Sequence, residues 1–196
     1  FKYCTSLKNV TLNENTKLSY AMFVNSGIEN IDIYEKIQIP AFAFAKCKNL
    51  KTVNIHNDLV SIGTGAFSEC NILTEVNILG ELGLIGSQTF YASPCINKFT
   101  LPNCEVEIGE YAFYQASGLE ELVFQENTKL KEVYGSLFTE TNLTTFTVHE
   151  NNPYYANAEN LLVNKEANTI ILAAVGHDFG DYTIDAKYTI INENYS

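Results

Sequence analysis

The sequence predicts an α/β solenoid, mostly parallel β with short helical turns, made of about seven repeats of roughly 23 residues. A phenylalanine recurs every 21 to 25 residues, at Phe1, Phe23, Phe44, Phe67, Phe90, Phe113 and Phe138. The residues around it also recur, since Ala66-Phe67-Ser68-Glu69-Cys70 repeats the pattern of Ala43-Phe44-Ala45-Lys46-Cys47. A fixed period in this range is typical of stacked repeats, in which each unit buries its apolar face against its neighbours.

Each repeat has three parts. The first is a short apolar stretch that ends in glycine, at residues 59–63, 82–86 and 106–109. The second is the turn around the phenylalanine, which is long enough for a helical turn or two. The third alternates apolar and polar residues, as in residues 74–78, and this period of two predicts a half-buried strand. Stacking the repeats would place these strands side by side in a parallel sheet and the phenylalanines in a buried column.

The order of the repeats defines the domain organisation. The array covers residues 1–148, and its strand segments end at Leu12, Ile33, Ile55, Ile78, Leu101, Phe124 and Val148. Residues 149–181 break the period and form an insert, in which segments 161–164 and 169–172 predict a hairpin. Residues 182–196 resemble the start of a further repeat. Because the chain begins and ends within a repeat, we expect it to be a segment of a longer array.

Composition argues against several classes of partner. The net charge is −11, and all 12 basic residues are lysines. Because arginine is the preferred ligand of phosphates and base edges, a nucleic-acid partner is not expected. No apolar run reaches the roughly 18 residues that span a bilayer, so we expect no membrane insertion in this segment.

The five cysteines are odd in number, and three of them follow the repeat. Cys4, Cys47 and Cys70 each come three residues after a repeat phenylalanine, where other repeats have serine, alanine or threonine. This position therefore predicts small buried side chains. Cys95 and Cys104 are out of phase, and the sequence leaves open whether they pair.

The sequence shows no pattern of catalytic residues, so we expect no enzyme, no cofactor and no metal site. His56 and His149 occupy the same place four repeats apart, which puts them roughly 19 Å from one another at the usual strand spacing. That distance is too great for a shared metal or proton, and all three histidines, His177 included, are expected to be solvated. Asp178 and Asp181 lie in a loop, for which calcium is the alternative to simple solvation.

The best candidate for a binding site is the outer face of the predicted sheet. In each strand the residues before and after the buried apolar one should point outward, which gives two mostly polar columns across the repeats. The partner-binding candidates on these columns are Asn30, Asp32, Thr52, Asn54, Glu75, Asn77, Lys98, Thr100, Glu121 and Val123. The alternative is that small polar residues merely solvate the sheet.

A second candidate is the pair Tyr154 and Tyr155, with Tyr134 as an optional third member, because exposed aromatic residues are frequent at interfaces. The alternative is that these tyrosines cover the end of the seventh coil beneath the insert.

The repeats resemble the BspA-like, Treponema-type leucine-rich repeats. Residues 61–63 match that family's Ile-Gly segment, residues 66–70 its Ala-Phe-x-x-Cys segment, and residues 73–78 its Leu-x-x-Val-x-Ile segment. The resemblance implies a leucine-rich-repeat solenoid in an extracellular or cell-surface protein. It further implies non-enzymatic binding of a protein ligand, as an adhesin that contacts host or neighbouring-cell proteins. The alternative is a rigid structural spacer that displays other domains.

Overall fold

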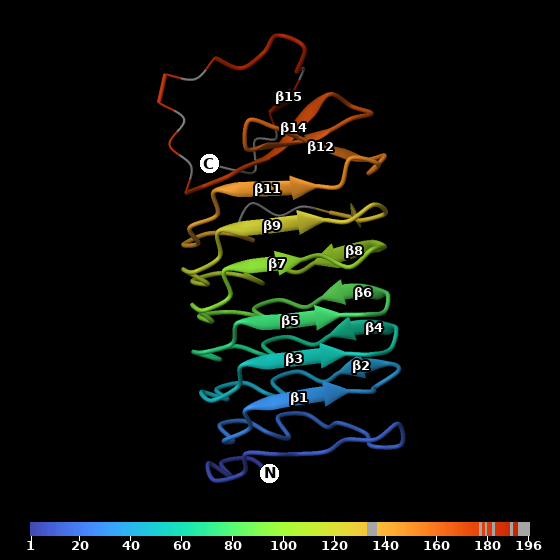
Figure 1. Cartoon of the computed structure of the whole chain (residues 1–196), viewed down its shortest axis with the longest axis vertical. Coiled ribbons are helices and arrows are strands. Elements are labelled where there is room, and N and C mark those ends of the chain that lie inside the picture. The colour runs from blue at the N-terminus through green and yellow to red at the C-terminus, as the bar shows by residue number, and fades with distance from the viewer. Residues whose placement is uncertain (133–136, 177, 179, 182, 189, 192–196) are drawn as a thin grey trace.

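The computed structural model describes residues 1–132, 137–176, 178, 180–181, 183–188 and 190–191, and these form a solenoid. The coils are stacked along the long axis of the molecule, with a front sheet, a back sheet and a stack of turns enclosing the core (Figure 1). The predicted repeat architecture is therefore confirmed, and neighbouring strands within both sheets are parallel.

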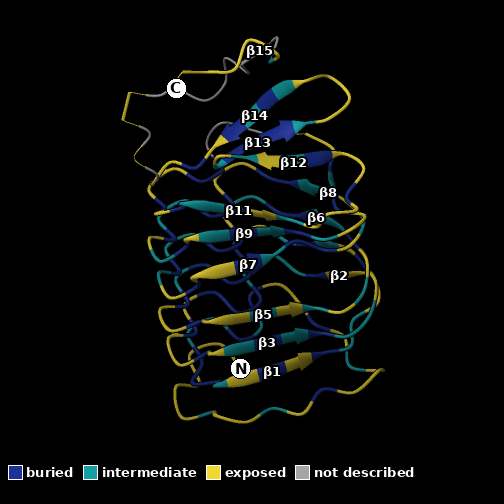
Figure 2. Ribbon diagram, turned by 45° about the horizontal axis from the view of Figure 1, so that its top comes forward, coloured by how far each residue is buried: buried dark blue, intermediate teal, exposed yellow. Residues whose placement is uncertain are grey.

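The front sheet contains the strand segments expected from the period of two. It consists of two three-stranded halves, ordered β1-β3-β5 and β7-β9-β11. Their bounds are β1 Asn30–Ile33, β3 Thr52–Ile55, β5 Glu75–Ile78, β7 Lys98–Thr100, β9 Glu121–Phe124 and β11 Thr145–Val148. Buried residues alternate with more exposed ones along these strands, so the outer face of the front sheet carries the more exposed residues (Figure 2).

The back sheet is formed by the apolar stretches that precede the turns. Its five strands are continuous in the order β2-β4-β6-β8-β10. Their bounds are β2 Gln38–Ile39, β4 Leu59–Ile62, β6 Leu82–Ile85, β8 Glu105–Ile108 and β10 Lys129–Leu130. The glycine after these strands allows coils to approach closely: a Cβ on Gly86 would lie 2.6 Å from the carbonyl oxygen of Ile62.

The predicted hairpin is present at the C-terminal end of the array. Strands β12 (Tyr155–Ala158), β13 (Leu161–Asn164) and β14 (Thr169–Ala173) pair antiparallel in sequence order. The short strand β15 (Ile190–Ile191) pairs in parallel with β14. Much of the segment expected to begin a further repeat, including Tyr182, Thr189 and residues 192–196, lies outside the described residues.

The recurring phenylalanines form the predicted column. Six successive ring pairs, from Phe1–Phe23 to Phe113–Phe138, are stacked with centroids 5.2–5.8 Å apart. From Phe23 to Phe113 the column is fully buried, whereas Phe1 is 64% exposed. Each ring therefore fills the space between its own coil and the next.

The turns around these rings are not helical, and the expectation of short helical turns is wrong. No helix occurs among the described residues. The residues two before and two after the phenylalanine adopt the left-handed conformation, with φ between 50° and 62°, at Ala21, Asn25, Phe42, Lys46, Gly65, Glu69, Gln88, Ala92, Tyr111, Gln115 and Glu140. Because left-handed residues do not continue a right-handed helix, each turn is cut to a few residues.

The turn stack instead has its own ladder between coils. In the third coil the N–H groups of Phe42, Phe44 and Lys46 donate to carbonyl oxygens of the next coil at 2.8–2.9 Å. The same three bonds recur one coil later, from Gly65, Phe67 and Glu69. The left-handed residues thus turn alternate N–H groups toward the neighbouring coil, which satisfies backbone donors that a helix would have used internally.

Fewer regular coils form than the seven phenylalanines suggested. Within the described residues, five coils contribute a strand to both sheets, and β1 is a sixth front strand whose own coil forms no back strand. Residues 1–12 follow the path of a coil without forming a strand. The solenoid therefore has about five regular turns, with less regular coils beside them.

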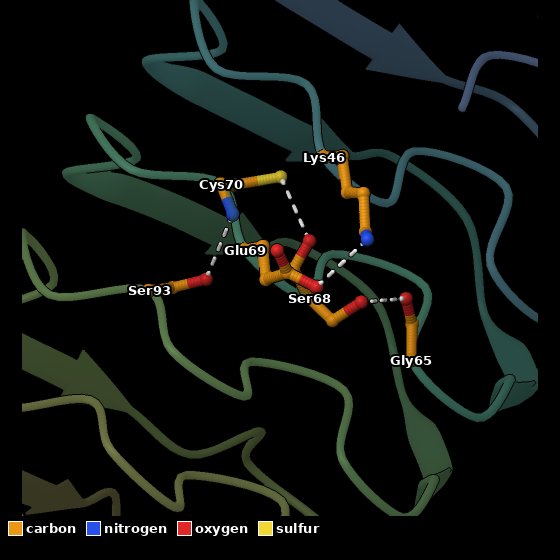
Figure 3. A network of polar contacts seen from close by, with 6 residues as sticks. All are labelled: Lys46, Gly65, Ser68, Glu69, Cys70 and Ser93. Carbon is orange, nitrogen blue, oxygen red and sulfur yellow. Dashed lines mark hydrogen bonds and ion pairs between the residues drawn. The ribbon is translucent and has the colours of Figure 1, made fainter. Parts of the chain in front are cut away.

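From the second coil on, the position three residues after the phenylalanine is buried, and in several coils its side chain also donates a hydrogen bond. The thiols of Cys47 and Cys70 donate to the carbonyl oxygens of Phe23 and Phe44, and the Ser93 hydroxyl donates to that of Phe67. Figure 3 shows the Ser93 hydroxyl also accepting from the amide of Cys70 in the preceding coil. Cys4, the third cysteine assigned to this position, is exposed.

None of the cysteines is paired. All five are free, so the disulfide between Cys95 and Cys104 that the sequence left open is absent. Burial raises the pKa of the Cys70 thiol well above its ordinary value, and it also raises the pKa of Cys47. Because the thiolate is the reactive form, these buried cysteines are structural.

The phenylalanine column should dominate stability. Phe67→Ala removes a fully buried ring from the middle of the column, and we expect it to lower the free energy of unfolding by about 3–5 kcal/mol. Phe1→Ala, at the exposed end of the same column, should cost less than about 1 kcal/mol. Urea unfolding of the two variants measures both values, and equal losses would contradict the column.

The close approach of the coils can be tested at Gly86. Gly86→Ala places a methyl group against the backbone of the preceding coil, which must move, and we expect a loss of about 1–3 kcal/mol. Ser87→Ala, one residue further on, adds no atom and serves as the control. A thermal unfolding curve for Gly86→Ala that matches the control would show that the coils do not need this glycine.

Candidate protein-binding surface

The strand register places the predicted site residues in two columns on the outer face of the front sheet. In the first half, Asn30 aligns with Thr52 and Glu75, and Asp32 aligns with Asn54 and Asn77. In the second half, one column continues with Lys98, Glu121 and Thr145, and the other continues with Thr100, Val123 and Thr147. The sheet thus brings together ten of the twelve predicted residues, six in the first half and four in the second.

Hydrogen bonds run along the column in the first half. The Asn54 amide donates to Asp32 at 3.0 Å, and the Asn77 amide donates to Asn54 at 2.9 Å. His56 lies beside this chain, with its Nε2 2.8 Å from an Asp32 carboxylate oxygen and its ring stacked on Tyr34 at 4.6 Å. These contacts fix the side chains in one arrangement although they are partly or fully open to solvent.

The same contacts affect the protonation of Asp32. The hydrogen bonds from His56 and then Asn54 lower the pKa of this carboxyl below its ordinary value of 3.8. The stabilisation by the carboxylate is therefore complete above about pH 3.8, and it is lost as the pH falls through the lowered pKa.

An ionic arrangement occupies the second half. Lys98 pairs with Glu121 at 3.1 Å, and the hydroxyl of Thr147 donates to the same carboxylate at 2.6 Å. The Thr147 hydrogen bond is the main cause of the lowered pKa of Glu121. The neighbouring column contains an apolar residue, Val123, between threonines. The two halves of the face therefore differ in chemistry.

The insert corrects the expectation for the tyrosines. Tyr155 is only 4% exposed: its hydroxyl accepts a hydrogen bond from the amide of Leu130 at 3.1 Å, and its ring packs edge-on against Phe124. It therefore covers the end of the array, and its ring is not available to a partner. Tyr154 is 38% exposed and lies beneath the ammonium group of Lys129. Tyr134 lies outside the described residues.

Asn152 fixes this end of the array. It is fully buried, and its side-chain amide donates to the carbonyl oxygens of Gln125 and Thr128 at 2.7 and 3.0 Å. Its side-chain oxygen accepts from the amides of Tyr154 and Tyr155, each at 2.9 Å. One side chain thus joins the start of the insert to the preceding coil.

The described residues offer little for catalysis. No group of three or more His, Cys, Asp or Glu side chains among them is placed to hold a metal ion. In the loop considered for calcium, Asp178 accepts a hydrogen bond from the amide of Gly180, which is an ordinary turn contact. His149 is exposed, whereas His177 lies outside the described residues. No helix in the described part of the chain is long and apolar enough to cross a membrane.

His56 is a member of this surface that the sequence pattern did not predict. The histidine was expected to be solvated, whereas it is hydrogen-bonded to Asp32 and stacked on Tyr34. The signal was available in the repeat, because Tyr34 and His56 hold the same place in successive coils, directly after β1 and β3. Residues one period apart lie next to one another in a solenoid.

The contact between His56 and Asp32 can be tested by titration. His56→Phe keeps a ring over Tyr34 but removes the hydrogen bond, so we expect the pKa of Asp32 to rise toward 3.8. NMR titration of the Asp32 carboxyl measures this shift, and His149→Phe is the matched control at the equivalent place four coils away. An unchanged Asp32 pKa in His56→Phe would refute the proposed hydrogen bond.

The chain is similar to several solved leucine-rich repeat proteins. One from Eubacterium ventriosum ATCC 27560 is 24% identical over 77% of this chain and 40% of that protein, with a TM-score of 0.61. One from Bacteroides ovatus ATCC 8483 is 16% identical over 76% and 50%, with a TM-score of 0.44. The pneumococcal vaccine antigen PcpA is 19% identical over 78% and 36%, with a TM-score of 0.32. This chain therefore spans half or less of each protein.

The comparisons with protein families give a direct match. No curated protein matches the chain. The family model described as the BspA type leucine rich repeat region matches residues 1–39 and 37–158, in six copies. This match covers more than half of the chain and follows the coils of the solenoid. The chain belongs to the BspA-type leucine-rich repeat family.

Proposed function

We propose that this chain binds a protein partner through the outer face of its front sheet, as a non-enzymatic segment of a secreted or cell-surface adhesin. A leucine-rich repeat solenoid is compatible with protein binding, because its stacked strands present a long ordered surface. The partner is a host extracellular or surface protein, or a protein of a neighbouring cell.

The observation that carries the proposal is the uneven chemistry of the two columns. One half is a hydrogen-bonded Asp-Asn-Asn chain with a histidine, and the other is a Lys-Glu-Thr cluster beside a valine. A spacer that only separates other domains needs a solvated surface with no particular pattern. A face whose polar groups are fixed in defined positions is pre-organised for recognition, since little side-chain entropy is lost when a partner binds.

Tyr154 is a second proposed contact, separate from the front face, because its ring lies beneath the ammonium group of Lys129 on the back strand β10. Its backbone amide is held at the end of the array by a hydrogen bond to the side-chain oxygen of Asn152. An anchored aromatic side chain is a frequent interface residue.

The proposal can be tested by capture of extracellular-matrix proteins and host-cell surface extracts on the immobilised chain. A quadruple variant, Asp32→Ala, Asn54→Ala, Glu75→Ala and Asn77→Ala, should lose at least tenfold in affinity for the captured protein. Lys46→Ala with Glu69→Ala removes an exposed ion pair from the turn stack and is the matched control. Capture of nothing at micromolar concentration would favour the spacer, and equal capture by the quadruple variant would exclude the front face.

A further inference from the structure

The front sheet is interrupted between β5 and β7. Within the described residues no ladder joins these two strands, although their places in successive coils make them neighbours. The gap between them is wider than between any other adjacent front strands (Figures 1 and 2). At the same boundary the back strands β4 and β6 are paired, and the turns are hydrogen-bonded from Gly65, Phe67 and Glu69. At this boundary, therefore, only the two front strands lack a hydrogen-bonded ladder.

A proline marks the end of the interruption. At three other boundaries, the amides of His56, Leu79 and His149, the residues directly after β3, β5 and β11, donate to carbonyl oxygens at the end of the preceding front strand. The residue at this place after β7 is Pro102, which has no N–H to donate to Ile78. Phe99 adds bulk beneath β7, where β3 has Val53, and its ring packs edge-on against Phe113 at 4.9 Å. The Phe67–Phe90 step, at this boundary, is the widest of the column at 5.8 Å.

The interruption leaves a groove of about 410 Å³ on the front face. Its walls include Glu75 and Asn77 from β5 and Lys98 and Thr100 from β7. Val76 and Ile78 also line it and are partly exposed, whereas the residues at their places in β3, Val53 and Ile55, are buried. The groove thus has polar rims and an apolar floor.

Both walls of this groove are strand edges. The main-chain groups of β5 that face β7, and those of β7 that face β5, take part in no ladder within the described chain. Such edges are templates for another strand, and proteins that bind extended peptides commonly add the peptide to an open edge. Some Cα atoms of β5 and β7 approach within 8 Å, whereas two strand spacings require roughly 9.6 Å. Insertion therefore needs these parts of the front sheet to move apart by at least about 1.6 Å, while the back sheet stays continuous.

We propose that this groove binds an extended segment of a partner protein as an added strand between β5 and β7. The proposal rests on the protein-binding function proposed above and specifies the mode of binding. The segment should carry β-branched apolar residues at alternate positions, because Val76 and Ile78 form the floor. It should also carry a lysine, because the Glu75 carboxylate has no ion-pair partner among the described residues, while Lys98 is already paired with Glu121.

A peptide copied from the chain itself is a suitable probe. Residues 50–57 contain Lys51, Val53 and Ile55, and within the fold this segment already forms the strand that pairs with the other edge of β5. Titration of the full chain with this peptide, followed by amide NMR spectra, should give saturable shifts confined to β5, β7 and their flanking residues. The same peptide with N-methylated amides at alternate positions should bind at least tenfold more weakly.

The matched variant closes the groove. Pro102→Leu introduces leucine, as at the equivalent Leu79 after β5, and so restores the missing N–H donor. We expect at least tenfold weaker peptide binding with an unchanged or higher melting temperature. Lys46→Ala with Glu69→Ala, in the turn stack away from the groove, should leave peptide binding unchanged. If the captured partner binds Pro102→Leu as well as it binds the unaltered chain, the added strand is refuted while the front-face proposal stands.

Three results would overturn the inference. The first is the absence of shifts at millimolar peptide, and the second is equal binding by Pro102→Leu. The third is a dimer of the chain that Pro102→Leu abolishes, as measured by sedimentation, because a second copy of the chain would then be the occupant of the groove.

Discussion

The structure depends on the contact between one coil and the next at the recurring phenylalanine. There the stacked rings lie 5.2–5.8 Å apart, and alternate N–H groups of each turn donate to the following coil. The rings remove apolar surface from water, while the hydrogen bonds satisfy backbone groups that the left-handed turn residues direct outward. Since each coil is completed only by its neighbours, the stability of the solenoid is the sum of such contacts.

This arrangement also determines what the surface can do. Because the coils are held by the turn stack and the back sheet, the front sheet can change its outer residues and even lose one ladder without loss of the fold. The asparagine–aspartate chain of the first half and the lysine–glutamate cluster of the second half are built on the same backbone register. The interruption between β5 and β7 separates the two and exposes edges that a uniform array would cover.

Much of the fold could be predicted from the sequence, because the same pattern of apolar and polar residues recurs in every coil. The phenylalanine column, the front strands, the hairpin and the two outward columns all follow from period and alternation. The turns could not be predicted: helix and tight left-handed turn need similar lengths, and residues such as Phe42, Lys46 and Gln88 rarely adopt positive φ. Tyr155 was misjudged because it belongs to the insert, which breaks the period, so its contacts with the Asn152 side chain and the Leu130 amide do not follow from the repeat. The open edge could not be predicted because the period gives no signal for the loss of one ladder; it coincides with Pro102, at a place where other repeats have tyrosine, histidine, leucine or glutamine.

Native-state hydrogen exchange tests most directly the claim that the turn contacts hold the coils together. The amides of Phe44, Phe67 and Phe90 donate across coil boundaries in the turn stack. They should exchange only through global unfolding, with protection that matches the free energy of unfolding from urea titration. Exchange of these three amides at the rate of exposed loop residues, while β3 and β9 remain protected, would contradict the account, because the sheets alone would then hold the solenoid together.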